Sequence, residues 1–383
     1  MSKTEYKSTN QLMRHLRDNG IDISGKLQKQ QLINTGYFHG YKGYRFFGES
    51  YNKIPFISYK EINATIQYDT KLKSLLYGKM MFIETAFKNI ALNTIMEEIG
   101  SSSIYDMYDK VVSSYKNSEE LSEDIKKKLQ ANKLNLQGSI QNSIAAAYRR
   151  DNPKITHFYN TVNYNEVPIW AVFEILTMGD FGHLLSCLTK DMRKKISRKI
   201  GINLSCDTNC TLVYKYVYAL KDLRNAIAHN DVVYDTRFRK MDPSRPMKQC
   251  LILEMGLPYI NFKTIGDYII LVCYCLKLLK VTKTEIKLFV REFEKITKEY
   301  EKMISHKMIQ LDFVIRSGHT FKRNAVYLKK ARGRMLNYLI KNCIEDIEKI
   351  KEIVIDDYHF SEDDSNDDHW VFIKDEKMKY IKK

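Results

Sequence analysis

The chain has 383 residues, enough for a sizeable hydrophobic core and two or three substructures. Its 62 basic and 46 acidic residues give a net charge of +16, which favours a polyanionic partner or an anionic membrane surface. No apolar run approaches the roughly 20 residues of a membrane span, and the N-terminus lacks the apolar core of a secretion signal. The seven cysteines are scattered along the sequence. We therefore expect a reduced, cytoplasmic protein that does not insert into a membrane.

Only 6 prolines and 16 glycines interrupt the chain, which favours a mainly α fold. An N-terminal aromatic and basic segment, residues 1–58, contains two predicted short helices at 8–19 and 26–34. Apolar residues at helical spacing over 59–99 predict one bent helix or two consecutive ones.

That long pattern opens the expected central domain, residues 59–304, which includes a polar insertion at 101–150. Residues 305–383 form a basic C-terminal extension. Within it we expect a helix at about 335–354 and, in the acidic run 362–368, a disordered loop.

Residues 37–47 interleave aromatic side chains with basic residues and glycine. One interpretation is a platform on which unpaired bases stack, formed by Tyr37, Tyr41 and Tyr44 with Arg45 beside them. The other is that these aromatics anchor an irregular segment onto the helical body. The two interpretations are compatible.

Basic residues also gather in a predicted helix at 190–199, which we expect to face no acidic compensation, and in the stretch 316–334. Such runs are commonly solvated faces, but they also suit RNA phosphates. The residues expected to contact RNA are Lys190, Arg193, Lys194, Arg198, Lys322, Arg323, Tyr327, Lys329, Lys330, Arg332 and Arg334.

The stretch from Arg224 to His229 places an arginine, Asn225 and a histidine at the end of an apolar helical run. Arginine presents a planar charged fork that suits phosphate, and histidine can transfer a proton near neutrality. These groups suffice to cleave RNA without a metal when the ribose 2′-hydroxyl is the nucleophile. On a regular helix, however, Arg224 and His229 diverge by roughly 140°. They converge only if the helix ends near His229, where Asn230-Asp231 is a plausible stop, or if a second copy completes the site. Otherwise Arg224 is a surface ion-pair residue and His229 a helix-end histidine.

Glu84 lies on the apolar face of the 59–99 pattern. A buried carboxylate there needs a partner, and Arg224 is the candidate; the alternative is a solvated glutamate. Cys206 and Cys210 have no second pair at zinc-site spacing, and neither a Walker loop nor a Rossmann fingerprint is present. We therefore expect no metal and no cofactor.

The residues from Arg224 to His229, including Asn225, resemble the R-x4-6-H motif of HEPN ribonuclease domains. Further blocks resemble the Abi (abortive infection) family of the AbiD/AbiF type, and the similarity spans roughly residues 8–300. At two positions where that family usually has arginine this chain has Lys73 and Lys88, which keep the charge but lose the bidentate fork. The blocks are residues 32–41, 68–72 with 82–88, and 156–159 with 167–179.

The resemblance implies a HEPN-like helical bundle with N-terminal and C-terminal helical extensions. It also implies a phage-defence endoribonuclease that works without metal. In it Arg224 would stabilise phosphate charge, His229 would act as general acid or base, and Asn225 would orient the helix end. Expected partners are a structured small non-coding RNA and a second copy of the chain. The alternative is a non-catalytic RNA-binding scaffold held in a ribonucleoprotein.

Overall fold

The computed structural model describes residues 6–113, 122–160, 166–304, 310–317, 320–322, 325–342, 347–366 and 369–375. The chain divides into two compact units, Met1–Met303 and Ile304–Lys383, which are described separately. It is mainly helical, as the sequence predicts.

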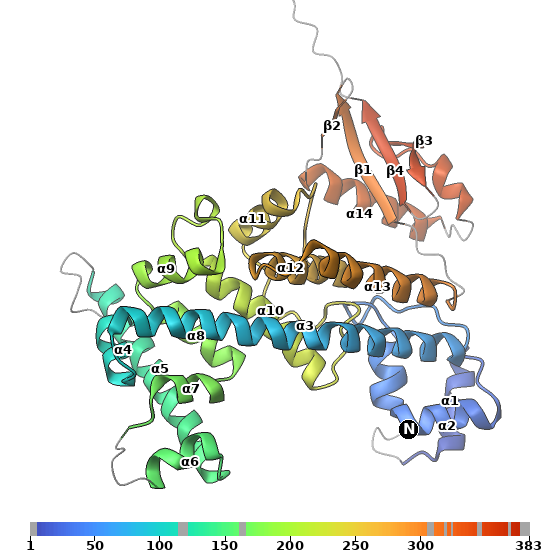
Figure 1. Ribbon diagram of the computed structural model, residues 1–383. Coiled ribbons are helices and arrows are strands. Elements are labelled where there is room, and N and C mark those ends of the chain that lie inside the picture. Colours follow the sequence, from blue (N-terminus) through green and yellow to red (C-terminus); the bar gives the residue numbers. More distant parts are fainter. Residues whose placement is uncertain are drawn as a thin grey trace, which may run out of the picture. The chain divides into compact units, whose positions relative to one another are not determined.

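The described part of the first unit consists of helices and connecting segments (Figure 1). Its α-helices are α1 (Thr9–Asp18), α2 (Gly25–Thr35), α3 (Tyr59–Ile99), α4 (Ile104–Lys110), α5 (Glu123–Arg149), α6 (Pro153–Asn160), α7 (Ile169–Ile175), α8 (Met178–Cys187), α9 (Lys190–Ile200), α10 (Leu212–Ala228), α11 (Arg245–Met255), α12 (Ile265–Leu278) and α13 (Lys283–Glu301).

The long helix α3 is the element on which the first unit is built, and Figure 1 shows it running through that unit. A capping box starts it: Ser58 accepts a hydrogen bond from the backbone of Glu61, and the Glu61 carboxylate accepts one from the backbone of Ser58. It ends at Gly100, whose φ of 68° few other residues adopt. Its 41 residues form one continuous helix about 60 Å long. Helices α9, α10, α12 and α13 all pack against it.

Helix α10 forms because its apolar residues recur on one side, and it buries that side against α3 and α8. The approach to α8 requires Gly182, since a Cβ atom there would lie 2.9 Å from the ring of Tyr218 on α10. The buried residues of α10 are Leu212, Val213, Tyr216, Val217, Leu220, Leu223 and Ala226.

The N-terminal segment contains α1 and α2, so both short helices predicted there are confirmed. Ser8 caps α1 through a capping box with Gln11. Gly36, at φ 73°, ends α2 and leads into a π-helical turn, Gly36–Lys42. This turn packs against α3 and places the aromatic segment beside it.

The second unit contains a four-stranded sheet that the sequence analysis did not predict. Its order is β2-β1-β4-β3; β1 runs parallel to β4, with Phe313 opposite Phe372, and the other pairs are antiparallel. The elements are β1 (Gln310–Ser317), β2 (Thr320–Lys322), α14 (Ala325–Lys341), a 3₁₀ turn (Glu348–Glu352), β3 (His359–Asn366) and β4 (His369–Asp375).

Two local expectations for this unit were wrong. Residues 362–366 of the acidic run belong to β3 rather than to a disordered loop; β3 is an edge strand, where exposed charged side chains are normal. The helix expected at 335–354 lies earlier, in α14. Its apolar face includes Ala331, Met335 and Leu339, which pack against the sheet.

Candidate functional site

The end of α10 has a defined geometry. Helix α10 stops at Ala228, and Asn230 follows in the left-handed conformation at φ 58°. The backbone N–H of Asp231 donates to the carbonyl of Ala226 at 2.8 Å, and that of Asn230 to Ile227 at 3.3 Å. These two bonds make a Schellman-type end. The predicted stop at Asn230-Asp231 is therefore confirmed, and His229 occupies the C-cap position.

Arg224 is held by the carboxylate of Glu84, the partner that the sequence analysis expected for that buried glutamate. Its Nε donates to Glu84 Oε2 at 3.2 Å and its Nη1 to Asn225 Oδ1 at 3.4 Å. Lys88 Nζ also donates to Glu84, at 2.8 Å, and to the carbonyl of Leu176 at 2.7 Å. Glu84 thus fixes the plane of the guanidinium, and among the described residues the Arg224 Nη2 group has no partner.

His229 is exposed, and its ring makes no hydrogen bond to the described part of the chain. Arg224 lies more than one turn earlier on α10, where its side chain points to Glu84. A single chain therefore places the two motif residues at the same end of one helix, with no hydrogen bond between their side chains.

A buried polar network, which the sequence did not predict, bonds to the segment that directly follows His229. Asp69 on α3 is fully buried and accepts hydrogen bonds at 2.8 Å from the backbone N–H groups of Val233 and Tyr234. Its other oxygen accepts from Tyr44 at 2.7 Å and lies 2.8 Å from Lys73 Nζ. Burial, the Asp69 charge and this hydrogen bond raise the pKa of Tyr44, so its hydroxyl remains a donor.

Asn230 links this network to the aromatic segment. Lys73 Nζ donates to Asn230 Oδ1 at 2.8 Å, and Asn230 Nδ2 lies 3.2 Å from His39 Nε2. Asp69 and Lys73 are four residues apart, the spacing of an ion pair on one helix face, which was the available sequence signal. His39 carried no such signal, because its partner is 191 residues away in the chain.

Lys73 and Lys88, the two departures from the family's usual arginines, are both engaged inside the protein. Lys73 is buried between Asp69 and Asn230, and Lys88 between Glu84 and a backbone carbonyl. Both ammonium groups are therefore engaged by partners within the protein.

The burial of the aromatic segment supports the interpretation that it anchors the chain to the helical body. Tyr44 is 1% exposed and Tyr41 9%, so their assignment as base-stacking residues was wrong: both rings belong to the core. Tyr37 is half-buried, while Phe38, which the sequence analysis did not single out, is 79% exposed.

Cations cluster on the same segment. The Lys42 ammonium lies over the Tyr37 ring and Arg45 over the Tyr41 ring. Partial burial, followed by the nearby charges of Arg45, Lys53 and Lys7, lowers the pKa of Lys42. This mutual repulsion marks a surface with an excess of positive charge, suited to an anion.

Helix α9 has three kinds of basic residue. Lys195 and Lys199 form ion pairs with Glu98 and Glu97 of α3, so the expectation of no acidic compensation was wrong for them. Arg193 donates to the carbonyls of Ser186, Leu188 and Cys210, which makes it a structural residue rather than an RNA contact. Lys190, Lys194 and Arg198 are exposed, lie at spacings of four residues, and have no partner in the described part of the chain.

In the second unit, Arg332 pairs with Asp312 and Arg334 with Asp356, while Lys322 and Lys330 are exposed. Arg323 lies outside the described residues, as do the side chains of Tyr327 and Lys329.

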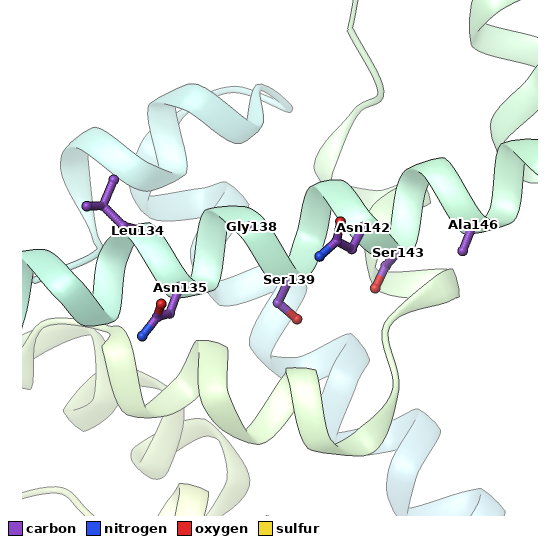
Figure 2. A pocket seen from close by; sticks show the side chains of 7 residues that line it. All are labelled: Leu134, Asn135, Gly138, Ser139, Asn142, Ser143 and Ala146. Carbon is purple, nitrogen blue, oxygen red and sulfur yellow. The ribbon is translucent and has the colours of Figure 1, made fainter.

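A hollow elsewhere in the first unit lacks the groups that phosphate chemistry needs. It lies along α5, and Figure 2 shows the side chains of Asn135, Ser139, Asn142 and Ser143 that line it together with Leu134, Gly138 and Ala146. None of these residues is a cation or a proton-transfer group. Among the described residues no cluster of His, Cys, Asp or Glu could hold a metal ion, and no helix is long and apolar enough to cross a membrane.

Comparison with known families identifies the region that contains this site. Residues 30–235, more than half of the chain, match the family model of Abi-like proteins. The chain belongs to the Abi-like protein family. The Abi-like region runs from α2 to just beyond the end of α10, so it includes His39, Asp69, Glu84, Arg224 and His229.

The C-terminal part is similar to a different family. Residues 276–364 match the model of the peroxide stress protein YaaA. A UPF0246 protein of Fusobacterium nucleatum is 32% identical over 126 residues, which cover 32% of this chain and 46% of that protein. One from Clostridium perfringens is 41% identical over 93 residues, 24% of this chain and 36% of that protein. The chain thus spans less than half the length of these relatives.

The buried network makes a stability prediction. Asp69→Ala leaves Lys73 buried without its counter-charge, so we expect the free energy of unfolding to fall by about 3–5 kcal/mol. The matched control is Glu299→Ala, which removes an exposed ion pair to Lys71 and should cost at most about 1 kcal/mol. Denaturant unfolding of both variants measures the difference. Equal losses would show that the Asp69 network does not stabilise the first unit.

Proposed function

We propose that this Abi-like protein is a phage-defence endoribonuclease that cleaves RNA without a metal, with Arg224 and His229 as its reacting residues. The supporting observation is that Glu84 holds the Arg224 guanidinium and leaves its Nη2 group without a partner among the described residues. Arg224 lies on the helix that ends in an exposed His229. The similarity of residues 224–229 to the HEPN motif points the same way.

In the proposed reaction the ribose 2′-oxygen attacks the adjacent phosphorus, and the bond from phosphorus to the 5′-oxygen breaks. One general base takes the 2′-hydroxyl proton and one general acid gives a proton to the departing oxygen. Arg224 would donate hydrogen bonds to the phosphate oxygens as charge builds up on them. His229 would supply one of the two proton transfers. The products are a 2′,3′-cyclic phosphate and a 5′-hydroxyl.

We further propose that the active form contains two copies of the chain. Within one chain the Arg224 side chain bonds to Glu84 and Asn225 and not to His229, and His229 lacks a hydrogen-bond partner among the described residues. HEPN nucleases commonly pair two motif helices across a dyad, and this chain has one such motif. A second α10 end would bring an arginine and a histidine from different chains to one phosphate.

The proposed RNA partner is a structured small non-coding RNA, as the AbiF resemblance implies. Two surfaces of the first unit would hold it: the stripe of Lys190, Lys194 and Arg198 on α9, and the positive segment with Lys42 and Arg45. The exposed ring of Phe38 could stack on an unpaired base.

A second candidate function is a non-catalytic RNA-binding scaffold within a ribonucleoprotein. One observation favours it: Glu84 holds Arg224 and Lys88 together, so part of the positive charge near the motif is already neutralised. A scaffold would use the α9 stripe in the same way but would not depend on His229.

The enzyme proposal predicts that Arg224→Ala and His229→Ala each reduce RNA cleavage in EDTA by about 10²–10⁴-fold, because each removes an essential group. The assay uses a labelled pool of single-stranded RNA and the full chain. The matched controls are Arg149→Ala and His183→Ala, which change the same residue types away from the motif. Cleavage by both motif variants at the parent rate would exclude the catalytic assignment and leave the scaffold.

The two-copy proposal predicts complementation. Arg224→Ala and His229→Ala chains, each inactive alone, should regain cleavage when mixed and allowed to reassociate, because the mixed pair contains one intact arginine and one intact histidine. Mixing Arg224→Ala with the double variant should restore none. If the first mixture also stays inactive while the parent protein cleaves, both residues must act from one chain.

The α9 stripe predicts a change in salt dependence. The triple replacement of Lys190, Lys194 and Arg198 by alanine is made in a His229→Ala background that leaves the RNA intact. It should make the negative slope of log affinity against log salt less steep by about 2–3. The control removes both members of the Lys195–Glu98 and Lys199–Glu97 pairs, and its slope should stay near that of the parent. An unchanged slope in the triple variant would place the RNA elsewhere.

A further inference from the structure

We propose that His39 is a further residue of the cleavage site, where it donates a hydrogen bond from Nδ1–H to an RNA phosphate oxygen while Asn230 positions its ring. This inference rests on the proposed function and extends it to a residue outside the R-x4-6-H motif. His39 belongs to the π-helical turn, and Asn230 directly follows His229.

His39 lies close to the motif through its contact with Asn230. Asn230 Nδ2 lies 3.2 Å from His39 Nε2. Consecutive Cα atoms are about 3.8 Å apart, so the partner of His39 is the immediate neighbour of the proposed proton-transfer residue. His39 and His229 are both exposed, at the same end of α10.

Lys73 fixes the orientation of the Asn230 amide. The oxygen and nitrogen of an asparagine amide exchange places when the group rotates by 180°, so hydrogen-bond partners must decide between the two orientations. A lysine ammonium group can only donate hydrogen bonds, so it must face the oxygen. Because Lys73 Nζ lies 2.8 Å from one side-chain atom of Asn230, that atom must be the oxygen. The NH₂ group therefore faces His39. Lys73 is itself fixed by buried Asp69, so this orientation is built into the fold.

The Asn230 amide in turn sets the tautomer of His39. An NH₂ group that faces Nε2 can only donate to it, so Nε2 is the acceptor and the ring proton lies on Nδ1. Among the described residues Nδ1 has no partner, and the side chain is exposed. Lys42 and Arg45, which belong to the same aromatic segment, add positive charge to this part of the surface and so favour an anion there. The ring thus presents a fixed N–H donor, which can stabilise phosphate charge without transferring its proton.

The test compares two substitutions in the full chain. In His39→Gln the amide oxygen can accept from Asn230 while the NH₂ group donates to phosphate, so it keeps the donor but cannot ionise. His39→Leu keeps neither. We expect His39→Leu to reduce RNA cleavage in EDTA by about 10²-fold, and His39→Gln to retain most of the parent rate. His15→Ala, a histidine of α1 in the same segment, is the matched control.

Each other pattern overturns the inference. Equal losses in His39→Leu and His39→Gln would show that His39 transfers a proton instead of donating a fixed hydrogen bond. Parent rates in both would show that it lies outside the site.

A second measurement separates this inference from the proposed function. In protein labelled with ¹⁵N-histidine, the His39 ring should show the Nδ1–H tautomer, lose that preference in Asn230→Ala, and shift when an uncleavable 2′-O-methyl RNA is added. If the parent protein cleaves no RNA, the proposed nuclease fails, and a His39 signal that still shifts would support the phosphate contact. A His39 signal that shows the other tautomer, or does not respond to the RNA, would overturn the inference whatever the cleavage result.

Discussion

The carboxylate of Asp69 joins three segments of the first unit that are far apart in the sequence. It accepts hydrogen bonds from Tyr44 in the aromatic segment and from the backbone at Val233 and Tyr234, just beyond α10, and it pairs with Lys73 on α3. A buried charge is tolerated only when it is paired and hydrogen-bonded in this way. Asp69 therefore ties the segment that follows α10, and with it the neighbouring His229, to α3.

A second carboxylate, Glu84, orients the motif arginine from the same helix. Both acids therefore lie on α3, and both act on the end of α10, with Asp69 near Asn230 and Glu84 near Arg224. The rigid 41-residue helix serves as the frame that holds the guanidinium and the histidine end in a fixed relation. The C-terminal part, similar to the UPF0246 and YaaA proteins, has its own sheet and its own core around Phe313 and Phe372.

Local patterns predicted what local forces determine. The capped helix at Ser8 and the stop at Asn230-Asp231 follow from local spacing. The pairing of Glu84 with Arg224, 140 residues away, was predicted for another reason: a buried carboxylate needs a partner, and the motif offered one. Three features depend on distant partners and could not be predicted. Tyr44 faces Asp69, Lys195 and Lys199 meet glutamates about 100 residues earlier, and His39 meets Asn230. The sheet of the second unit was not predicted, because its acidic edge strand β3 has the composition of a loop.

The most direct test of the account is the chemistry of the cut ends. The full chain is incubated in EDTA with a labelled random-sequence RNA pool, and in parallel with the same pool made of 2′-O-methyl RNA. The account predicts fragments with 2′,3′-cyclic phosphate and 5′-hydroxyl ends from the first pool and no cleavage of the second. Fragments with 5′-phosphate ends, cleavage of the 2′-O-methyl pool, or cleavage only after a divalent metal is added would contradict it.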